Sequence, residues 1–273
     1  MSNVAKIIIL IGQSNAVGVG YYEYLPNHFS AEKVEELMKG YKNVRINFYS
    51  HDFGSNGFTD TKVSLAELTK KTFGPELGIA EKLNSDFPDQ TFYIVKFAIG
   101  GTTLFHDWLS PTSRKKECKA SCGELSYGYC YDGFAELLRK SIDLLKDKGL
   151  SPEIRAVCWM QGESDACDKI NVDAYPSRFD DLIKDFENEF KPYLKNYVLV
   201  DGGISPEWEF YREMNAFKKS YANGKNRKFI DTIGEGLTTV NEPVGNPDRP
   251  HYDSDSVIKL GNMFESAIKE NLN

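Results

Sequence analysis

The stretch "IIILIGQSNAVGVG", residues 7–20, decides the fold and raises the first question about function. Five aliphatic residues run from Ile7 to Ile11, the run stops at Gly12, and a serine follows two positions later. A short continuous apolar run bounded by turn residues is typical of a strand buried on both faces of a sheet. Ser14 is therefore expected just beyond the carboxyl end of the first strand. Because turns need Gly, Ser and Asn, the stretch alone does not distinguish a nucleophile from a turn residue.

Further apolar runs follow along the chain, and segments with helical periodicity separate them. The runs are VRINFY (44–49), TFYIVKFAI (91–99), IRAVCWM (154–160), YVLVD (197–201) and KFIDTI (228–233). The helical segments cover residues 75–86, 133–149, 175–190, 207–221 and 254–271. Strands that are apolar throughout and alternate with helices predict an α/β fold, a three-layer α/β/α sandwich with a mainly parallel central sheet.

Composition bounds the class of protein. The chain has 273 residues, 41% of them hydrophobic, and without internal repeats or a linker, residues 1–273 are predicted to form one domain. No run of roughly 18 apolar residues predicts a membrane span, and the net charge of −7 argues against a nucleic-acid partner. The amino terminus lacks the cleavage site of a signal peptide. The compartment stays open, cytoplasmic as the chain stands or secreted if a signal was removed, and so does the oligomeric state.

The cysteines give no sign of a metal site. Of the five, Cys118, Cys122 and Cys130 share one polar segment, while Cys158 lies in an apolar run and Cys167 in an expected loop. The C-x3-C-x7-C spacing matches no zinc pattern, and no histidine lies within the segment. We therefore expect no metal and no organic cofactor, with a local disulfide only if the protein is exported.

Polar residues follow several of the expected strands, where a parallel sheet gathers its ligand site. A serine nucleophile needs a histidine base, and the base needs a carboxylate that orients it. Of the four histidines, only His251 has an aspartate, Asp248, three positions before it on an apparent turn. A lone Asp-x-x-His is a weak motif. Ser14 in "GQSNA" and Ser164 in "GESDA" both fit Gly-x-Ser-x-Ala, so the residues alone leave two candidate nucleophiles.

A resemblance favours the first serine. "GQSN" (12–15), "GG" (100–101), "WMQGESD" (159–165) and the Asp-x-x-His before the last helix resemble the blocks of the SGNH hydrolases. "FGPELGIAEKL" (73–83) and "DW" (107–108) also resemble their carbohydrate-esterase branch, the acetylxylan esterases and sialate O-acetylesterases.

The resemblance implies a flavodoxin-like sheet and a serine esterase that removes O-acetyl groups from carbohydrates such as acetylated xylan. It implies that Ser14 is the nucleophile, His251 the base and Asp248 the residue that orients the base. The oxyanion is then held by the Ser14 backbone N–H, by that of Gly101 in preference to Gly100, and by the Gln161 amide. Glu163 is expected to fix Gln161, to contact the surroundings of the serine, or only to close a turn. A sialic acid O-acetylesterase and a non-catalytic sugar-binding protein of the same fold are the alternatives.

One segment departs from the resemblance. Residues 109–131, rich in Lys, Cys and Tyr, are expected to be a loop insertion near the site that shapes substrate choice. Four aromatic residues there and beside it are candidates to stack on a sugar ring, with core packing as the alternative. They are Trp108, Tyr127, Tyr129 and Tyr131.

Overall fold

The computed structural model describes residues 3–51, 53–62, 72–117 and 127–272. Among these residues, an eight-stranded sheet lies at the centre, in the order β10-β9-β8-β1-β7-β3-β4 with β5 paired to β3. Its strands are β1 (Val4–Gly12), β3 (Tyr41–Ser50), β4 (Phe53–Gly54), β5 (Thr59–Thr61), β7 (Phe92–Ala98), β8 (Ser151–Met160), β9 (Leu194–Gly202) and β10 (Arg227–Ile230). A separate antiparallel pair joins β2 (Gly20–Tyr21) to β6 (Thr72–Phe73).

All six apolar runs of the sequence form strands, and these strands pair in parallel. The five from β7 through β1 and β8 to β9 and β10 have the order 2-1-3-4-5 of a flavodoxin-like sheet. β3 extends the sheet beyond β7, and β4 and β5 add short antiparallel pairings to it. The predicted mainly parallel sheet is confirmed. At β1 the strand order reverses, because the chain places β3 and β7 on one side of β1 and β8, β9 and β10 on the other.

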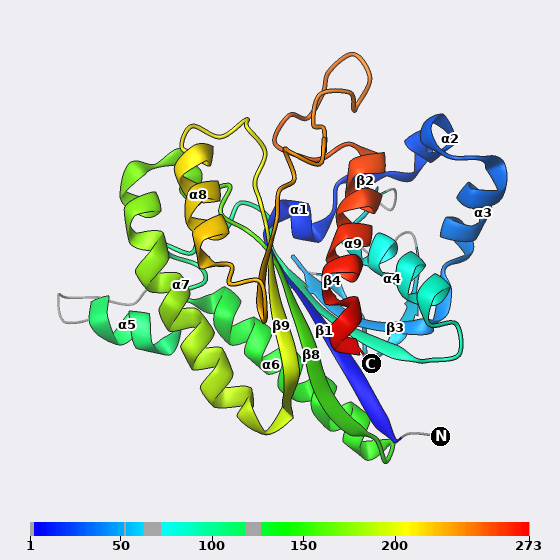
Figure 1. Ribbon diagram of the computed structural model, residues 1–273, viewed down its shortest axis with the longest axis horizontal. Helices are drawn as coiled ribbons and strands as arrows, with labels where there is room; N and C mark the ends of the chain where they lie inside the picture. Colours follow the sequence, from blue (N-terminus) through cyan, green and yellow to red (C-terminus); the bar gives the residue numbers. More distant parts are fainter. Residues whose placement is uncertain (1–2, 52, 63–71, 118–126, 273) are drawn as a thin grey trace.

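Helices cover both faces of the sheet (Figure 1). On one side, α4 (Pro75–Asp86) packs against α9 (Ser254–Ile268), with α2 (Leu25–His28) and α3 (Ala31–Lys39) beyond them. On the other lie α5 (Pro111–Glu117), α6 (Tyr129–Asp147), α7 (Lys169–Phe190) and α8 (Tyr211–Tyr221). The remaining short elements are α1 (Ser14–Val17), η1 (Tyr22–Tyr24), η2 (Asp165–Cys167), η3 (Lys191–Tyr193) and η4 (Lys269–Leu272). Within the described ranges, no helix is long and apolar enough to span a membrane.

The first strand is buried along its length because it lies between β7 and β8 and under helices on both faces. Ile7 to Leu10 are fully buried and Ile11 is 2% exposed, so truncating one of them to alanine would cost about 2–5 kcal/mol. Gly12 ends the strand with φ +149°, and a Cβ there would lie 1.8 Å from the Met160 carbonyl oxygen. Only glycine therefore lets β1 approach β8 closely enough to place the following serine at the sheet edge.

A buried ion pair supports the turn after β1. Lys96, in the middle of β7, donates to Glu76 at 2.6 Å and to the Val17 carbonyl at the end of α1 at 2.7 Å. Burial lowers the pKa of Lys96, and the Glu76 carboxylate opposes that effect. Removing one partner of such a pair typically costs about 3–5 kcal/mol, because the other charge is left buried alone.

The expected loop over residues 109–131 is wrong for residues 111–117 and 129–131, which are helical. Residues 111–117 form α5, and α6 begins at Tyr129. α5 docks on α7, where the Thr112 backbone N–H and hydroxyl both donate to Asp185, each at 2.7 Å. Residues 118–126, with Cys118 and Cys122, lie outside the described residues.

The aromatic side chains and cysteines of this region differ in their exposure. Trp108 and Tyr131 are 0% and 2% exposed, so they pack in the core and are not available to a sugar. Tyr129 is 39% exposed, and Tyr127 packs edge-on against His106. Among the described cysteines, three thiols are free, at Cys130 and Cys158 in the core and at Cys167 on the surface.

Candidate active site

A pocket of about 420 Å³ opens at the carboxyl edge of the sheet, where residues from six segments of the chain meet. It is lined by Gln13, Ser14, Val17, Val19, His51, Gly100, Gly101, Ser164, Trp208, Asp248, Pro250 and His251. Four residues selected from the sequence, Ser14, Gly101, Asp248 and His251, thus lie at one pocket. Gln161 and Glu163 are fully buried and do not line it.

Ser14 begins α1 directly after the elbow that ends β1. The Gln13 backbone N–H donates to the Met160 carbonyl at 2.9 Å, which fixes the elbow against β8. Ser14 is partly exposed to the pocket. Neither its hydroxyl nor its backbone N–H has a hydrogen-bond partner within the described ranges, so both are available to a substrate.

The predicted Asp248–His251 pair is present. His251 Nδ1 lies 2.7 Å from Asp248 Oδ2, and the His251 backbone N–H donates to the Asp248 carbonyl at 2.8 Å. A carboxylate only accepts, so Nδ1 carries the proton and Nε2 of the neutral ring is an acceptor. The side chains are 39% and 23% exposed, for Asp248 and His251 respectively. This exposure limits the electrostatic strength of the pair but not its control of the tautomer.

Asn15 ties the serine loop to the histidine loop, a role that the sequence reading missed. Its amide donates to the Pro250 carbonyl at 3.2 Å, and its carbonyl accepts from the Tyr252 backbone N–H at 3.1 Å. Both chain neighbours of His251 are therefore held by the residue that follows Ser14. The signal in the sequence was the Asn of "GQSN", which looks like an ordinary turn residue.

Glu163 accepts a hydrogen bond from the Asn15 side chain. Its Oε1 accepts from the Asn15 amide at 2.9 Å, and its Oε2 is buried without a hydrogen-bond partner in the structure. Burial raises the pKa of Glu163, partly offset by the Asn15 hydrogen bond. Of the three expectations for Glu163, contact with the surroundings of the serine fits this geometry.

The expectation that Gln161 donates to an oxyanion disagrees with the structure. Its amide nitrogen donates to Asp165 at 2.6 Å and to the Thr102 carbonyl at 3.1 Å, which uses both N–H bonds. Its oxygen accepts from the Tyr175 hydroxyl at 2.9 Å. A fully buried amide takes its partners from the surrounding fold, and the motif could not show that Asp165 would be the partner.

Asp165 organises the loop that follows the glycine pair. Its carboxylate accepts the backbone N–H groups of Leu104 at 2.8 Å and Phe105 at 2.9 Å, besides the Gln161 amide. Burial raises the pKa of Asp165 to about 6, and these hydrogen bonds oppose the shift. The carboxylate therefore fixes the segment that follows Gly101, a residue of the pocket wall.

Gly100 and Gly101 are distinguished by a second histidine, His51. Its Nε2 accepts the Gly100 backbone N–H at 3.1 Å, and its backbone has φ +44° directly after β3. The Gly101 N–H, at φ +74°, has no acceptor among the described residues and borders the pocket. Of the two, Gly101 is therefore the one with a free donor. His51 was among the four histidines in the sequence, but it has no aspartate three positions before it, the spacing that singled out His251.

Ser164, the competing serine, is engaged by a neighbour. Its hydroxyl accepts from the Gln13 side-chain amide nitrogen at 3.2 Å, and its backbone N–H donates to the Gln13 side-chain oxygen, also at 3.2 Å. Both ends of the Gln13 side chain thus bind Ser164. This pairing joins the elbow after β1 to the turn after β8.

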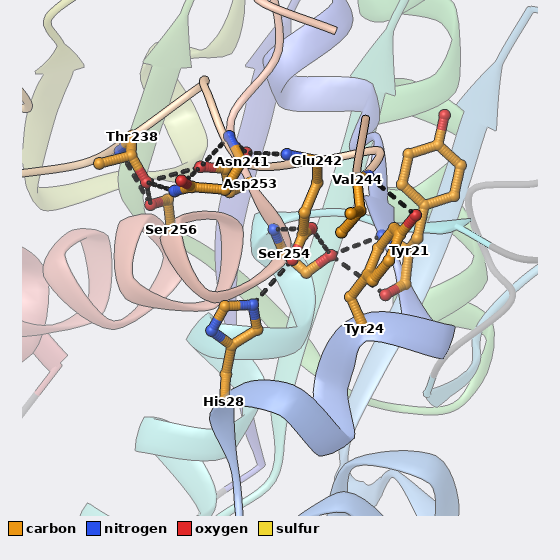
Figure 2. Close-up of polar contacts among 10 residues, drawn as sticks. All are labelled: Tyr21, Tyr24, His28, Thr238, Asn241, Glu242, Val244, Asp253, Ser254 and Ser256. Carbon is orange, nitrogen blue, oxygen red and sulfur yellow. Dashed lines mark hydrogen bonds and ion pairs between the residues drawn. The ribbon is translucent and has the colours of Figure 1, made fainter. Parts of the chain in front are cut away.

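The loop that carries Asp248 and His251 is anchored by a second polar network, which Figure 2 shows. Buried Glu242 lies 2.7 Å from His28 Nε2, and it also accepts the Ser254 backbone N–H at 2.7 Å and the Ser254 hydroxyl. The Glu242 carbonyl in turn accepts the Asp248 backbone N–H at 2.9 Å. His28 on α2, distant in sequence, thereby helps to position the catalytic candidates.

Asp253 completes this network. Asp253 directly precedes α9, and its side chain faces the loop (Figure 2). Its carboxylate accepts the backbone N–H groups of Asn241 at 3.1 Å and Glu242 at 2.9 Å, and the Thr238 hydroxyl at 2.7 Å. The carboxylate thus fixes the loop base.

The described part of the chain holds no cluster of three or more His, Cys, Asp or Glu side chains arranged to bind a metal ion.

Comparison with known proteins places the chain in a family. A family model described as carbohydrate esterase, sialic acid-specific acetylesterase, matches residues 4–270. Among curated proteins there is no match.

Solved structures share the fold at low identity. A protein from Arabidopsis thaliana has a TM-score of 0.70 at 19% identity and covers 99% of this chain and 100% of its own. NanS has a TM-score of 0.66 at 18% identity, covering 99% and 98%. A carbohydrate acetylesterase from Xanthomonas citri has a TM-score of 0.59 at 14% identity, covering 97% of this chain and 56% of its own. These matches and the family model confirm the predicted fold and the resemblance to carbohydrate esterases.

Proposed function

The chain belongs to the carbohydrate esterase family of sialic acid-specific acetylesterases, and we propose that it hydrolyses O-acetyl esters of sugars through Ser14, His251 and Asp248. The observation that supports this most directly is the Asp248–His251 hydrogen bond of 2.7 Å at the pocket that Ser14 also lines. Asn15 adds to it, because one side chain holds both neighbours of His251 and directly follows the serine.

The reaction begins when Ser14 Oγ attacks the acetyl carbonyl carbon while His251 Nε2 accepts the hydroxyl proton. Asp248 keeps the proton on Nδ1 and stabilises the imidazolium that forms. The negative charge on the carbonyl oxygen is met by the backbone N–H groups of Ser14 and Gly101. Collapse of the tetrahedral intermediate expels the sugar alcohol, which takes the proton from His251 and leaves an acetyl ester on Ser14.

Water completes the cycle. His251 accepts a proton from the water as its oxygen attacks the acetyl carbon, and the second tetrahedral intermediate releases acetate and the Ser14 hydroxyl. The proton returns from His251 to Ser14 Oγ, so the enzyme is unchanged. The residues named here complete the cycle without a cofactor.

Ser14 is preferred to Ser164 on contacts. Ser14 Oγ has no partner among the described residues, whereas Ser164 is bound at its hydroxyl and backbone N–H by Gln13. Ser14 also has its neighbour joined to the histidine loop.

Acetyl-ester hydrolysis by Ser14→Ala and Ser164→Ala tests this assignment. With p-nitrophenyl acetate, we expect Ser14→Ala to lose nearly all turnover and Ser164→Ala to keep most of it. Activity retained in Ser14→Ala would exclude Ser14 as the nucleophile, and an inactive wild type that binds acetylated sugar would point to a binding protein. Acetate release from acetylated xylan beside O-acetylated sialic acid then identifies the sugar.

A further inference from the structure

From three cavities that share residues, we propose that an uncharged oligosaccharide chain lies in a groove leading from the active-site pocket along α6. The inference rests on the proposed function, because the groove would hold the sugar rings next to the acetylated one. A cavity of about 560 Å³ shares His51 with the pocket of Ser14, and its wall includes Ile99 beside Gly100. Two cavities that share one side chain and have adjacent backbone residues in their walls lie next to each other.

A third cavity extends the groove. It has a volume of about 480 Å³ and shares Tyr49, Leu137 and Lys140 with the 560 Å³ cavity. Each of the three has the size of a small-molecule site, whose typical range is about 300–1,000 Å³. Three such sites in a row fit a chain of sugar units better than a single acetylated ring.

The middle cavity has aromatic walls suited to sugar rings. Tyr49 is 36% exposed and stacks on Phe97 with ring centroids 5.4 Å apart and planes 16° apart. Tyr129, 39% exposed, begins α6 and lines the same cavity. The negative face of an aromatic ring attracts the weakly positive C–H groups of a pyranose.

At Gly133 the helix packs directly on the aromatic floor of the cavity. Gly133 stands one turn after Tyr129 on α6, and a Cβ there would lie 2.8 Å from two carbons of the Phe97 ring. Glycine therefore lets α6 lie close to Phe97, so that the helix and the aromatic floor form adjoining walls of the cavity.

The charges along the groove favour a neutral sugar over an anionic one. Three acidic side chains line it, Glu136, Asp143 and Asp147, against one basic side chain, Lys140. Lys140 is itself paired with Glu136, four residues earlier on α6. An anionic chain would meet a net negative wall, whereas the hydroxyls of a neutral chain find both donors and acceptors there.

The test compares substrates that differ only in length, an acetylated methyl xyloside and acetylated xylotetraose. We expect Tyr129→Ala to lower kcat/KM on the tetrasaccharide about fivefold, mainly through KM, because one aromatic contact accounts for a factor of this order. Turnover of the monosaccharide and of p-nitrophenyl acetate should not change. Lys140→Ala, at a side chain 68% exposed and therefore safe for folding, should lower kcat/KM on the tetrasaccharide alone, about twofold to threefold.

Tyr221→Ala is the matched control, since this tyrosine ends α8, which packs on β10, and it lines none of the three cavities. Wild-type kcat/KM on the tetrasaccharide in both Tyr129→Ala and Lys140→Ala would overturn the groove. Calorimetric titration of Ser14→Ala with unacetylated xylotetraose separates this inference from the proposed function. Binding that Tyr129→Ala weakens in the same background supports the groove even if no acetyl ester is turned over, and absence of binding contradicts it.

Discussion

Replacing Asn15 by alanine tests how the two halves of the site are joined. The substitution removes three hydrogen bonds, to Glu163 at 2.9 Å, to the Pro250 carbonyl at 3.2 Å and from the Tyr252 N–H at 3.1 Å. It leaves Glu163 buried with neither oxygen paired, because Oε2 already has no partner in the structure. The buried Tyr252 N–H loses its acceptor as well.

The expected loss follows from these unpaired groups. A buried polar group left without its hydrogen bond costs about 1–3 kcal/mol. For Asn15→Ala we therefore expect the free energy of unfolding in urea to fall by about 2–5 kcal/mol, since two buried groups lose partners. A displacement of about 1 Å at a reacting group can reduce the rate about 10²-fold, so kcat on p-nitrophenyl acetate should fall 10- to 100-fold as His251 loses its position.

Glu163→Gln is the matched control. The glutamine oxygen can still accept from Asn15, and the variant places no charge at a position where burial raises the pKa of the carboxyl. We expect the unfolding free energy of Glu163→Gln to equal or exceed that of the wild type, with kcat within about tenfold. Wild-type kcat and unfolding free energy in Asn15→Ala would refute the view that Asn15 positions the histidine loop.

Further predictions concern the base, its loop and a buried acid. On p-nitrophenyl acetate, His251→Ala should lose more kcat than Asp248→Asn, because the first removes the base and the second removes only the group that orients the base and stabilises its imidazolium; equal losses would mean that the base does not act without Asp248. Glu242→Ala should lower the free energy of unfolding in urea by about 2–4 kcal/mol, because it leaves the buried Ser254 N–H unpaired, and it should lower kcat as well. An unchanged kcat would show that Glu242 does not position the catalytic residues. Burial raises the pKa of Asp165 to about 6 from 3.8, so Asp165 keeps its proton to a higher pH in the native state than in the unfolded chain. The stability that the neutral acid contributes is therefore full below pH 3.8 and is lost as the pH rises through 6. Relative to Asp165→Asn, the wild type should lose up to about 3 kcal/mol of unfolding free energy between pH 4 and 7; a constant difference would show that the hydrogen bonds keep the carboxylate ionised.

Much of the fold could be predicted because its strands are buried on both faces. Runs such as Ile7–Ile11 have to be apolar at every position, so periodicity identified each of them. Lys96 is one of the buried polar residues that depart from this pattern. Its charge is balanced by Glu76 from α4, a contact that strand periodicity does not encode. α5 was not predicted because its sequence, "PTSRKKE", is polar and short, and because side chains of α7 hold it in place.

Some residues of the candidate site could likewise be predicted from the sequence, and others could not. The Asp248–His251 pair could be predicted because both residues lie on one turn, three positions apart. Asn15 and His51 could not be placed, since their partners come from segments distant in sequence. Gln161 binds Asp165 of its own motif, but its other partners, such as the Thr102 carbonyl, are distant. Local spacing therefore indicated the Asp–His pair, while the residues that position it depend on the assembled sheet edge.

The identity of the nucleophile is the central claim, and covalent labelling tests it most directly. A serine-reactive organophosphate should inactivate the enzyme with one adduct per chain, and fragment-ion mass spectrometry should locate that adduct on Ser14. His251→Ala should react far more slowly, because the base that activates the hydroxyl is missing. An adduct on Ser164, or full inactivation with Ser14 unmodified, would contradict the proposed mechanism.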